Sequence, residues 1–211
     1  MNIFECISTR RSIREFSEED IPREDILRII DAARMAPSGH NVQPWHFLVV
    51  KKKETLEEMA RAVEERIEKI KNETSDEELR RRLGFLKNFS TFFKKAPAVI
   101  VVLTDCFSYK DRILEHYIRS GLSEFEAHRM RGLPYIQSLG AAIQNLLLAA
   151  HALGYGACWM TMPLVAKDEL ERILRIRADW DIVALVPVGK PLKIPEAPRK
   201  KSLEEIVTFL E

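Results

Sequence analysis

The sequence predicts an α+β protein in which a small β-sheet is surrounded by helices and one long helix lies at the centre. Two observations lead to this prediction. Only four short apolar runs are typical of strands, and long stretches with helical periodicity separate them. Residues 133–153 are rich in Ala and Leu and apolar on most faces, as in a helix buried inside a fold. Since the chain has 211 residues, 46% of them hydrophobic, we expect residues 1–211 to form one domain.

The first part of the chain predicts two helices and a strand. Asn2 can cap a short helix over residues 3–9. A second helix is expected over 23–36, where apolar residues recur at helical spacing until Pro37 ends it. Residues 45–50 form a continuous apolar run, which predicts a strand buried on both faces of the sheet.

The middle of the chain predicts helices around a second strand. The charged stretch 53–93 has helical periodicity and is expected to break near residues 72–75. Residues 98–103 read AVIVVL, an uninterrupted β-branched run that predicts a strand. The segment 105–131 is mixed and amphipathic, without a strand signal.

The last part predicts the central helix over 133–153, a third strand over 157–161, a surface helix over 164–174 and a fourth strand over 182–188. Residues 202–205 resemble a capping box that would open a terminal helix, although the following IVTFL is equally compatible with a strand. The central helix is more apolar than a monomer of this size usually buries, so we expect a second subunit to cover it.

Charge and composition exclude several classes of partner. Lys and Arg total 33 against 32 Asp and Glu, a net charge of +1, which argues against binding to nucleic acid or to an anionic membrane. The N-terminus lacks the features of a signal peptide, and polar residues interrupt the apolar stretch 140–162. We therefore expect a cytoplasmic protein.

Cysteine and histidine spacing gives no metal site. Cys6, Cys106 and Cys158 are far apart, and we expect free thiols that pack as small hydrophobic groups. His40 and His46 lie six residues apart across a loop and a strand, without the converging donors that a metal requires.

Basic residues gather near both ends of the chain. The sequence RRSIR places Arg10, Arg11, Ser12 and Arg14 directly after the first helix, and guanidinium groups with a hydroxyl suit a phosphate monoester. PRKKS adds a second basic run at residues 198–202. From charge alone, a solvated surface is the more common role of such basic runs.

A polar loop at residues 37–44 precedes the first strand. It contains Ser38, Gly39, His40, Asn41 and Gln43, which offer a hydroxyl, open backbone, an imidazole and two amides. Paired amides suit the alternating donors and acceptors of a heterocycle, and a loop at a sheet edge is a common place for a ligand. A plain polar turn remains the alternative. No nucleotide-binding glycine motif or hydrolase nucleophile motif is present, and no general base stands out.

Five segments in order resemble the nitroreductase family of FMN-dependent NAD(P)H oxidoreductases. They are STRRSIREF, APSGHNVQPWHFLVV, GAAIQNLLLAAHALGYGACWM, VPVGKP and PRKKSLEEIV, and together they extend over nearly the whole chain. The resemblance implies a nitroreductase-like fold: a homodimer in which a mixed sheet surrounds a long central helix and two FMN molecules lie at the interface.

The resemblance also implies the cofactor-binding residues. Arg10, Ser12 and Arg14, with Arg11 alongside, would hold the phosphate and ribityl chain of FMN. The polar loop and the third strand would lie against the flavin, with the backbone of Thr161 near its N5 atom. The expected flavin contacts are Pro37, Ser38, Gly39, Asn41, Trp159, Met160 and Thr161, and the expected C-terminal phosphate contacts are Gly189, Lys190, Arg199 and Lys201.

In this interpretation the chemistry belongs to the cofactor and needs no catalytic side chain. NADH or NADPH would give hydride to the flavin, which would then reduce a nitroaromatic, quinone or flavin-like acceptor in a ping-pong cycle. Two alternatives remain: a non-catalytic protein that binds a flavin or a phosphorylated metabolite through the same Arg and Ser residues, and a nucleic-acid-binding protein that uses the basic runs.

Overall fold

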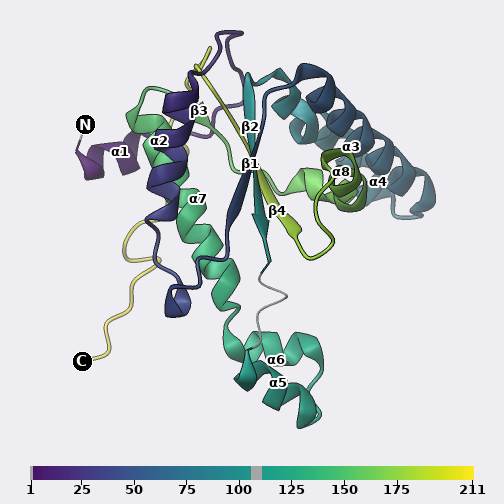
Figure 1. Cartoon of the computed structure of the whole chain (residues 1–211), viewed down its shortest axis with the longest axis vertical. Helices are drawn as coiled ribbons and strands as arrows, with labels where there is room; N and C mark the ends of the chain where they lie inside the picture. The colour runs from purple at the N-terminus through teal and green to yellow at the C-terminus, as the bar shows by residue number, and fades with distance from the viewer. Residues whose placement is uncertain (1, 106–110) are drawn as a thin grey trace.

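The computed structural model describes residues 2–105 and 111–211 and shows a sheet with helices on both faces (Figure 1). Its helices are α1 (Ile3–Thr9), α2 (Arg23–Arg34), α3 (Lys53–Glu73), α4 (Glu77–Thr91), α5 (Arg112–Arg119), α6 (Glu124–Arg131), α7 (Pro134–Ala152) and α8 (Lys167–Leu174). Its strands are β1 (His46–Val50), β2 (Ala98–Thr104), β3 (Gly156–Ala157) and β4 (Asp181–Gly189). Short 3-10 turns are η1 (Gly39–Asn41), η2 (Phe92–Lys95) and η4 (Met162–Ala166). The predicted α+β class is confirmed.

The four strands form one sheet in the order β1-β2-β4-β3, and each neighbouring pair is antiparallel. The resemblance implied a mixed sheet. Among the described residues, the parallel element is an isolated bridge between Ser12 and Ala157, outside the named strands. That bridge attaches the N-terminal segment to the sheet edge at β3.

Side chains of the sheet alternate between two cores. Ile100 of β2 and Val186 of β4 pack with α2 and α7 on one face, whereas Val101 and Leu185 pack with α3 and α8 on the other. All seven residues of β2 are buried because β2 is central. The predicted burial of the first strand on both faces is only partly right. β1 contacts both cores, but its position at the sheet edge leaves most of its side chains half-buried.

The predicted central helix is confirmed as α7. Leu133 precedes it in a left-handed conformation, and Pro134 occupies the first turn, where its missing N–H costs nothing. Its buried residues pack against α2 and the sheet. Within residues 2–105 and 111–211, no helix has the length and apolarity needed to cross a membrane.

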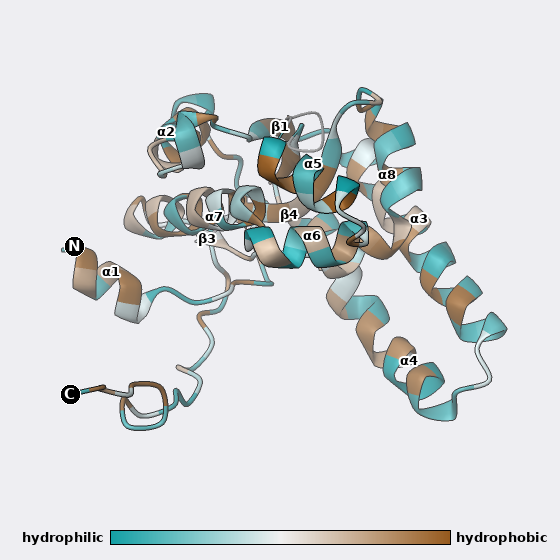
Figure 2. Cartoon of the chain, turned by 90° about the horizontal axis from the view of Figure 1, so that it is seen from below, coloured by the Kyte–Doolittle hydropathy of each residue, from teal (hydrophilic) through white to brown (hydrophobic). Residues whose placement is uncertain are grey.

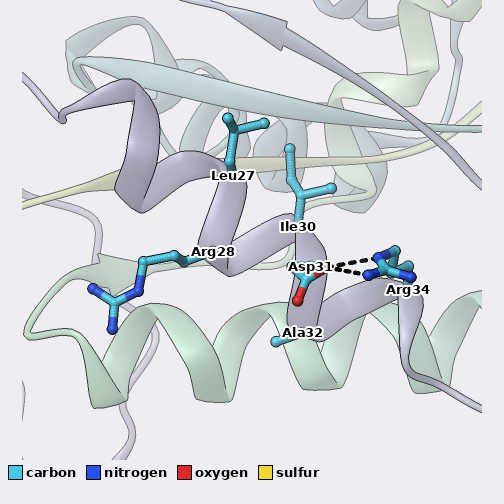
Figure 3. A pocket seen from close by; sticks show the side chains of 6 residues that line it. All are labelled: Leu27, Arg28, Ile30, Asp31, Ala32 and Arg34. Atoms are coloured by element: carbon cyan, nitrogen blue, oxygen red, sulfur yellow. Dashed lines mark hydrogen bonds and ion pairs between the residues drawn. The ribbon is translucent and has the colours of Figure 1, made fainter.

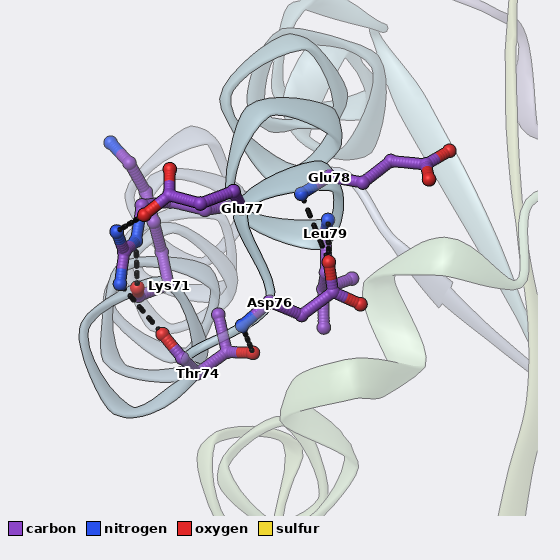
Figure 4. Close-up of polar contacts among 7 residues, drawn as sticks. Lys71, Thr74, Asp76, Glu77, Glu78 and Leu79 are labelled. Atoms are coloured by element: carbon purple, nitrogen blue, oxygen red, sulfur yellow. Dashed lines mark hydrogen bonds and ion pairs between the residues drawn. The ribbon is translucent and has the colours of Figure 1, made fainter.

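The predicted break in the charged stretch is the turn between α3 and α4 (Figure 4). Asp76 caps α4 by accepting hydrogen bonds from the backbone N–H groups of Glu78 (2.9 Å) and Leu79 (3.0 Å). Arg80 donates to the carbonyl of Thr74 at 2.7 Å and closes the turn from the other side. These contacts join α3 and α4 as an antiparallel pair, which lies on the same face of the sheet as α8.

The predicted third strand is wrong in length. β3 contains only two residues, followed by an isolated bridge between Met160 and Leu185. Cys158 donates to the carbonyl of Pro187 at 3.3 Å, but Pro187 has no N–H to return, so the ladder is interrupted there. The predicted surface helix likewise begins with the 3-10 turn η4 and becomes α-helical only at Lys167.

Neither the terminal helix nor the alternative strand expected after residue 202 is formed. The backbone N–H of Ser202 donates to Glu205 at 2.8 Å, as half of a capping box would, but only a turn follows. All residues of the C-terminal tail (192–211) are exposed, including Leu203, Ile206 and Phe209. A short helix needs a surface to pack on, and the tail packs on none within the described chain.

Candidate functional site

The N-terminal basic segment lies against β3. Ile13 donates its backbone N–H to the carbonyl of Ala157 at 3.0 Å, next to the bridge between Ser12 and Ala157. A Cβ atom added to Gly156 would lie 2.5 Å from Cγ1 of Ile13, so only glycine permits this approach. The structure therefore brings the segment that carries Arg10 and Ser12 next to β3 and the residues that follow it.

The cationic cluster (Arg10, Arg11 and Arg14) is not neutralised by residues 2–105 and 111–211. Arg11 donates to the carbonyls of Ser8 and Arg10 at 2.8 Å each, and Arg14 donates to the carbonyl of Ser12 at 3.3 Å. In the described part of the chain, no salt bridge involves these three arginines. Their charge is available to an external anion.

Cys158 lies beside this cluster. Burial raises the pKa of the Cys158 thiol, and this effect outweighs the nearby charges of Arg14 and Arg10 and a hydrogen bond with Ser12, which act in the opposite direction. The thiol is therefore protonated at neutral pH. Cys158 and Cys6 are both buried free cysteines, as expected, whereas Cys106 lies outside the described residues.

The segment after β3 exposes two of its three predicted site residues. Trp159 is 41% exposed. Its ring lies against Gly140 of α7, where an added Cβ atom would be 3.5 Å from the ring, in van der Waals contact. Met160 is buried and exchanges two backbone hydrogen bonds of 2.9 Å with Leu185. Thr161 is exposed at the start of η4. Trp159 and Thr161 thus face outward from a backbone that the sheet holds in place.

The C-terminal basic residues do not join the cluster. Lys190 lies with its ammonium 4.5 Å from the ring centre of Tyr155, whose hydroxyl donates to Asp25 at 2.7 Å. Burial, together with Asp25, raises the pKa of Tyr155 to about 12. Arg199 and Lys201 lie on the exposed tail, which stands clear of the helices around the sheet (Figure 2). Gly189 is buried against Phe16 and Pro97.

The polar loop has an unusual backbone. His40, Asn41 and Gln43 all have positive φ angles, at 52°, 54° and 49°, in a region that non-glycine residues rarely adopt. Ser38 stabilises the loop by accepting the N–H of Gln43 at 3.0 Å on its hydroxyl. No atom of the described residues lies within 4 Å of a Cβ built on Gly39. Strained backbone of this kind concentrates at ligand-binding sites.

The polar loop and the cationic cluster lie near different ends of α7. Thr9, next to Arg10, contacts His151 in the last turn of α7 at 2.8 Å. In contrast, α2 runs back along α7, with Ala32 opposite Asn145 (3.2 Å), and η1 follows beside the lower half of α7 in Figure 1. A helix of 19 residues is about 28 Å long. One chain therefore does not gather all of the predicted residues around one ligand.

The sequence did not indicate that His151 lies beside the cationic cluster, because a single histidine in an apolar helix carries no spacing signal.

Two other features of the structure lie outside the candidate site. The hollow on the outer side of α2 is lined by exposed pairs such as Asp31 with Arg34 and contains none of the predicted residues (Figure 3). Lys94, another basic residue near the second strand, pairs with Glu64 and Glu57.

Comparison with known proteins gives consistent results. A model of the Nitroreductase family matches residues 7–190. A Methanothermobacter thermautotrophicus protein named "Putative NADH dehydrogenase/NAD(P)H nitroreductase" is 30% identical over 199 residues, which cover 92% of this chain and 80% of that protein.

Solved structures agree with this match. The crystal structure of a BluB-like flavoprotein from Clostridium difficile 630 superposes with a TM-score of 0.88 at 34% identity, with both chains fully covered. An oxidised iodotyrosine deiodinase bound to FMN and 3-iodo-L-tyrosine superposes with a TM-score of 0.71 at 24% identity, covering 99% of this chain and all of that one.

Proposed function

The chain belongs to the nitroreductase family, and on that premise we propose that it is an FMN-dependent oxidoreductase. In this proposal NADH or NADPH supplies electrons, and a small molecule of the nitroaromatic, quinone or flavin-like class receives them. The names of related proteins support the nicotinamide, and the FMN bound to a structural neighbour supports the cofactor.

The observation that carries the proposal is the cationic cluster. Three arginines that form no salt bridge with the described residues lie within five positions of the chain together with Ser12, and a close contact of Ile13 with Gly156 fixes their backbone. Arg groups with a hydroxyl form strong, directed hydrogen bonds to phosphate oxygens. The residues present therefore fit the phosphate of FMN.

The flavin ring requires the other part of the proposed site. Pro37, Ser38, Gly39 and Asn41 of the polar loop would contact one side of the ring, where Gly39 leaves open space. Trp159, Met160 and Thr161 would line the other side. Gly189 would support the phosphate site through its contact with Phe16, whereas Lys190 is engaged with Tyr155.

We propose that two copies of the chain complete each site. The cationic cluster of one copy would hold the phosphate, and the polar loop of the other would contact the ring. This arrangement explains why the two groups lie near different ends of α7 in one chain. It would also allow Arg199 and Lys201, on the tail, to approach the phosphate from outside the folded body.

In this proposal the residues of the chain bind FMN and supply electrostatic stabilisation beside its ring. Bound FMN would supply the hydride chemistry, accepting hydride from the nicotinamide and passing electrons to the acceptor. The cluster would hold the cofactor by its phosphate, and the strained polar loop would present backbone and amide groups in a fixed orientation. Fixed donors and positive charge beside the ring stabilise negative charge as it develops. No proton transfer by a side chain is required.

The experiment is anaerobic reduction of the purified, FMN-loaded protein by NADH and by NADPH, followed through flavin absorbance. We expect one or both nicotinamides to bleach the flavin, and an added quinone or nitroaromatic to restore its colour. A yellow protein that neither nicotinamide bleaches would instead be the non-catalytic flavin-binding protein. A protein that binds no FMN would refute the proposal.

A further inference from the structure

His151 is a titratable group beside the cationic cluster. It lies in the last turn of α7, half-buried, and its Nε2 atom is 2.8 Å from the hydroxyl oxygen of Thr9. Thr9 ends α1, and the next residue is Arg10, whose backbone leaves the helix. The contact therefore connects the buried central helix to the root of the cluster.

The hydrogen bonds of Thr9 suit one tautomer of the His151 ring. The Thr9 hydroxyl lies 2.6 Å from the carbonyl oxygen of Glu5, which can only accept, so the hydroxyl can donate there. Its oxygen can then accept the Nε2–H of His151. In that tautomer, Nε2 carries hydrogen in the neutral and the charged ring, and Nδ1 is the atom that gains or loses a proton.

The charges around His151 oppose its protonation. Burial lowers the pKa of His151, and the guanidinium groups of Arg10 and Arg11 lower it further. The carbonyl end of α7 acts in the opposite direction, since a helix C-terminus favours a cation. From α1, Glu5 directs its carboxylate to the N–H of Asn2 at 3.0 Å, and the thiol of Cys6 donates to the carbonyl of Leu148 at 3.3 Å.

We propose that His151 is a positioning residue of the phosphate subsite: it holds the end of α1 through Thr9, and it takes up a proton when a phosphate group binds to the cationic cluster. The inference rests on the proposed function. A phosphate monoester brings between one and two negative charges from about pH 5.5 to pH 8, and about 1.5–2 at pH 7, to Arg10 and Arg11, which offsets the repulsion that opposes a charged imidazole. By thermodynamic linkage, phosphate binding favours the protonated form of His151 by a certain factor, and protonation of His151 tightens phosphate binding by that same factor.

The experiment titrates the apoprotein with FMN between pH 5.5 and pH 8, for the unaltered chain and for His151→Gln. Gln keeps an N–H group able to reach Thr9 but cannot gain charge. The phosphate of FMN itself titrates near pH 6 in both proteins, so the ratio of the two dissociation constants isolates His151. We expect this ratio, variant over unaltered, to increase by about fivefold from pH 8 to pH 5.5, at the lower end of typical coupling between two sites.

A second measurement needs no variant. NMR titration of the His151 ring should give a higher pKa in the FMN complex than in the apoprotein. Thr9→Val, which removes the acceptor but keeps the imidazole, should weaken FMN binding by a similar factor at every pH. A ratio that does not vary with pH, together with an unchanged pKa on FMN binding, would refute the inference while leaving the proposed function intact. Absence of FMN binding by the unaltered chain would refute both.

Discussion

At the scale of residues, the candidate site consists of arginines whose positive charge is not paired with a carboxylate of the described chain, on a backbone that close contacts hold in place. The hydrogen bonds of Arg11 and Arg14 go to neutral carbonyls, and Ile13 fits against β3 only because Gly156 has no side chain. The cluster is therefore held by its backbone, while its positive charge stays available.

Replacing Arg10 or Arg14 by Ala should weaken FMN binding by about 10- to 100-fold, because a hydrogen bond to a charged group contributes about 1.5–3 kcal/mol. Titration of the apoprotein with FMN measures this change. Arg82→Ala, at an exposed position on α4, is the matched control and should leave the dissociation constant unchanged. Unchanged binding in both cluster variants would place the phosphate elsewhere.

Two glycines should respond differently to substitution by Ala. Gly156→Ala would force Ile13 away from β3, and overpacking of this kind costs about 1–3 kcal/mol of unfolding free energy. Gly39→Ala has open space and should leave stability within about 0.5 kcal/mol, as surface substitutions usually do, while weakening FMN binding. Chemical denaturation and FMN titration of the two variants separate these effects. Equal FMN affinity in Gly39→Ala and the unaltered chain would count against a flavin beside the polar loop.

Residue types in the sequence were enough to single out the cationic cluster and the polar loop, and their role in binding stays a prediction. They could not predict the position of Lys190, because its contact with Tyr155 joins segments that only the fold brings together. The same limit applies to His151, whose partner Thr9 is 142 positions away in the chain. When the position of a side chain depends on one partner that is distant in the sequence, the residues around it show no local pattern that would predict the contact.

At the scale of elements, helices and strands with strong periodicity or continuous apolar runs were predicted well, including α7, β2 and β4. The errors occurred where one residue or the lack of tertiary packing overrides a local pattern. Pro187 cannot donate to its neighbouring segment, so the predicted third strand is reduced to β3 and an isolated bridge. The tail has a capping signal but packs on no surface of the part of the chain that the structure describes, so its helix does not form.

The pair α5 and α6 should open at acid pH. Burial opposes ionisation of Asp111, but hydrogen bonds from Arg131 and from the N–H groups of Leu114 and Ile113 prevail and lower the pKa of Asp111. A carboxylate with a lowered pKa stabilises the fold above its unfolded pKa, near 3.9, and this stability is lost as the pH falls through the folded value. Hydrogen exchange at the Ile113 and Leu114 amides should therefore accelerate, relative to the intrinsic rate, below about pH 4.

Asp111→Asn should remove this pH dependence. It should also lower the free energy of local opening by about 1.5–3 kcal/mol at neutral pH, since the charged partner of Arg131 is lost. Asp179→Asn, which disrupts an exposed pair with Arg177, should change stability by less than about 1 kcal/mol. Equal effects of the two substitutions would show that Asp111 does not hold α5 and α6 together.

At the scale of the whole molecule, a single chain leaves apolar surface uncovered. Ile3, Phe4 and Ile7 of α1 are 56%, 79% and 53% exposed, and Phe209 and Leu210 of the tail are 81% and 97% exposed. Exposed apolar surface on this scale is typical of protein interfaces. Both groups lie on segments that stand apart from the body in Figure 2.

We therefore predict an obligate homodimer that buries more than about 2,000 Å² in total. Sedimentation of the FMN-loaded protein should give a dimer down to low micromolar concentration. Phe4→Glu combined with Phe209→Glu should weaken the dimer, whereas Phe85→Glu on α4, an equally exposed residue on the outer helix pair, should not. A folded monomer that retains FMN would contradict this prediction.

The most direct test of the account is FMN binding by a mixed dimer, because its central claim is that a flavin binds between the cluster of one copy and the loop of another. One copy carries Arg10→Ala with Arg14→Ala, and the other carries Gly39→Phe, which fills the open space beside the loop. Each variant alone should bind FMN poorly. A shared site predicts that the isolated mixed dimer regains half of the FMN of the unaltered dimer, since one of its sites combines the two intact parts. A mixed dimer that binds no more FMN than its parents would show that each site lies within one chain and would contradict the account.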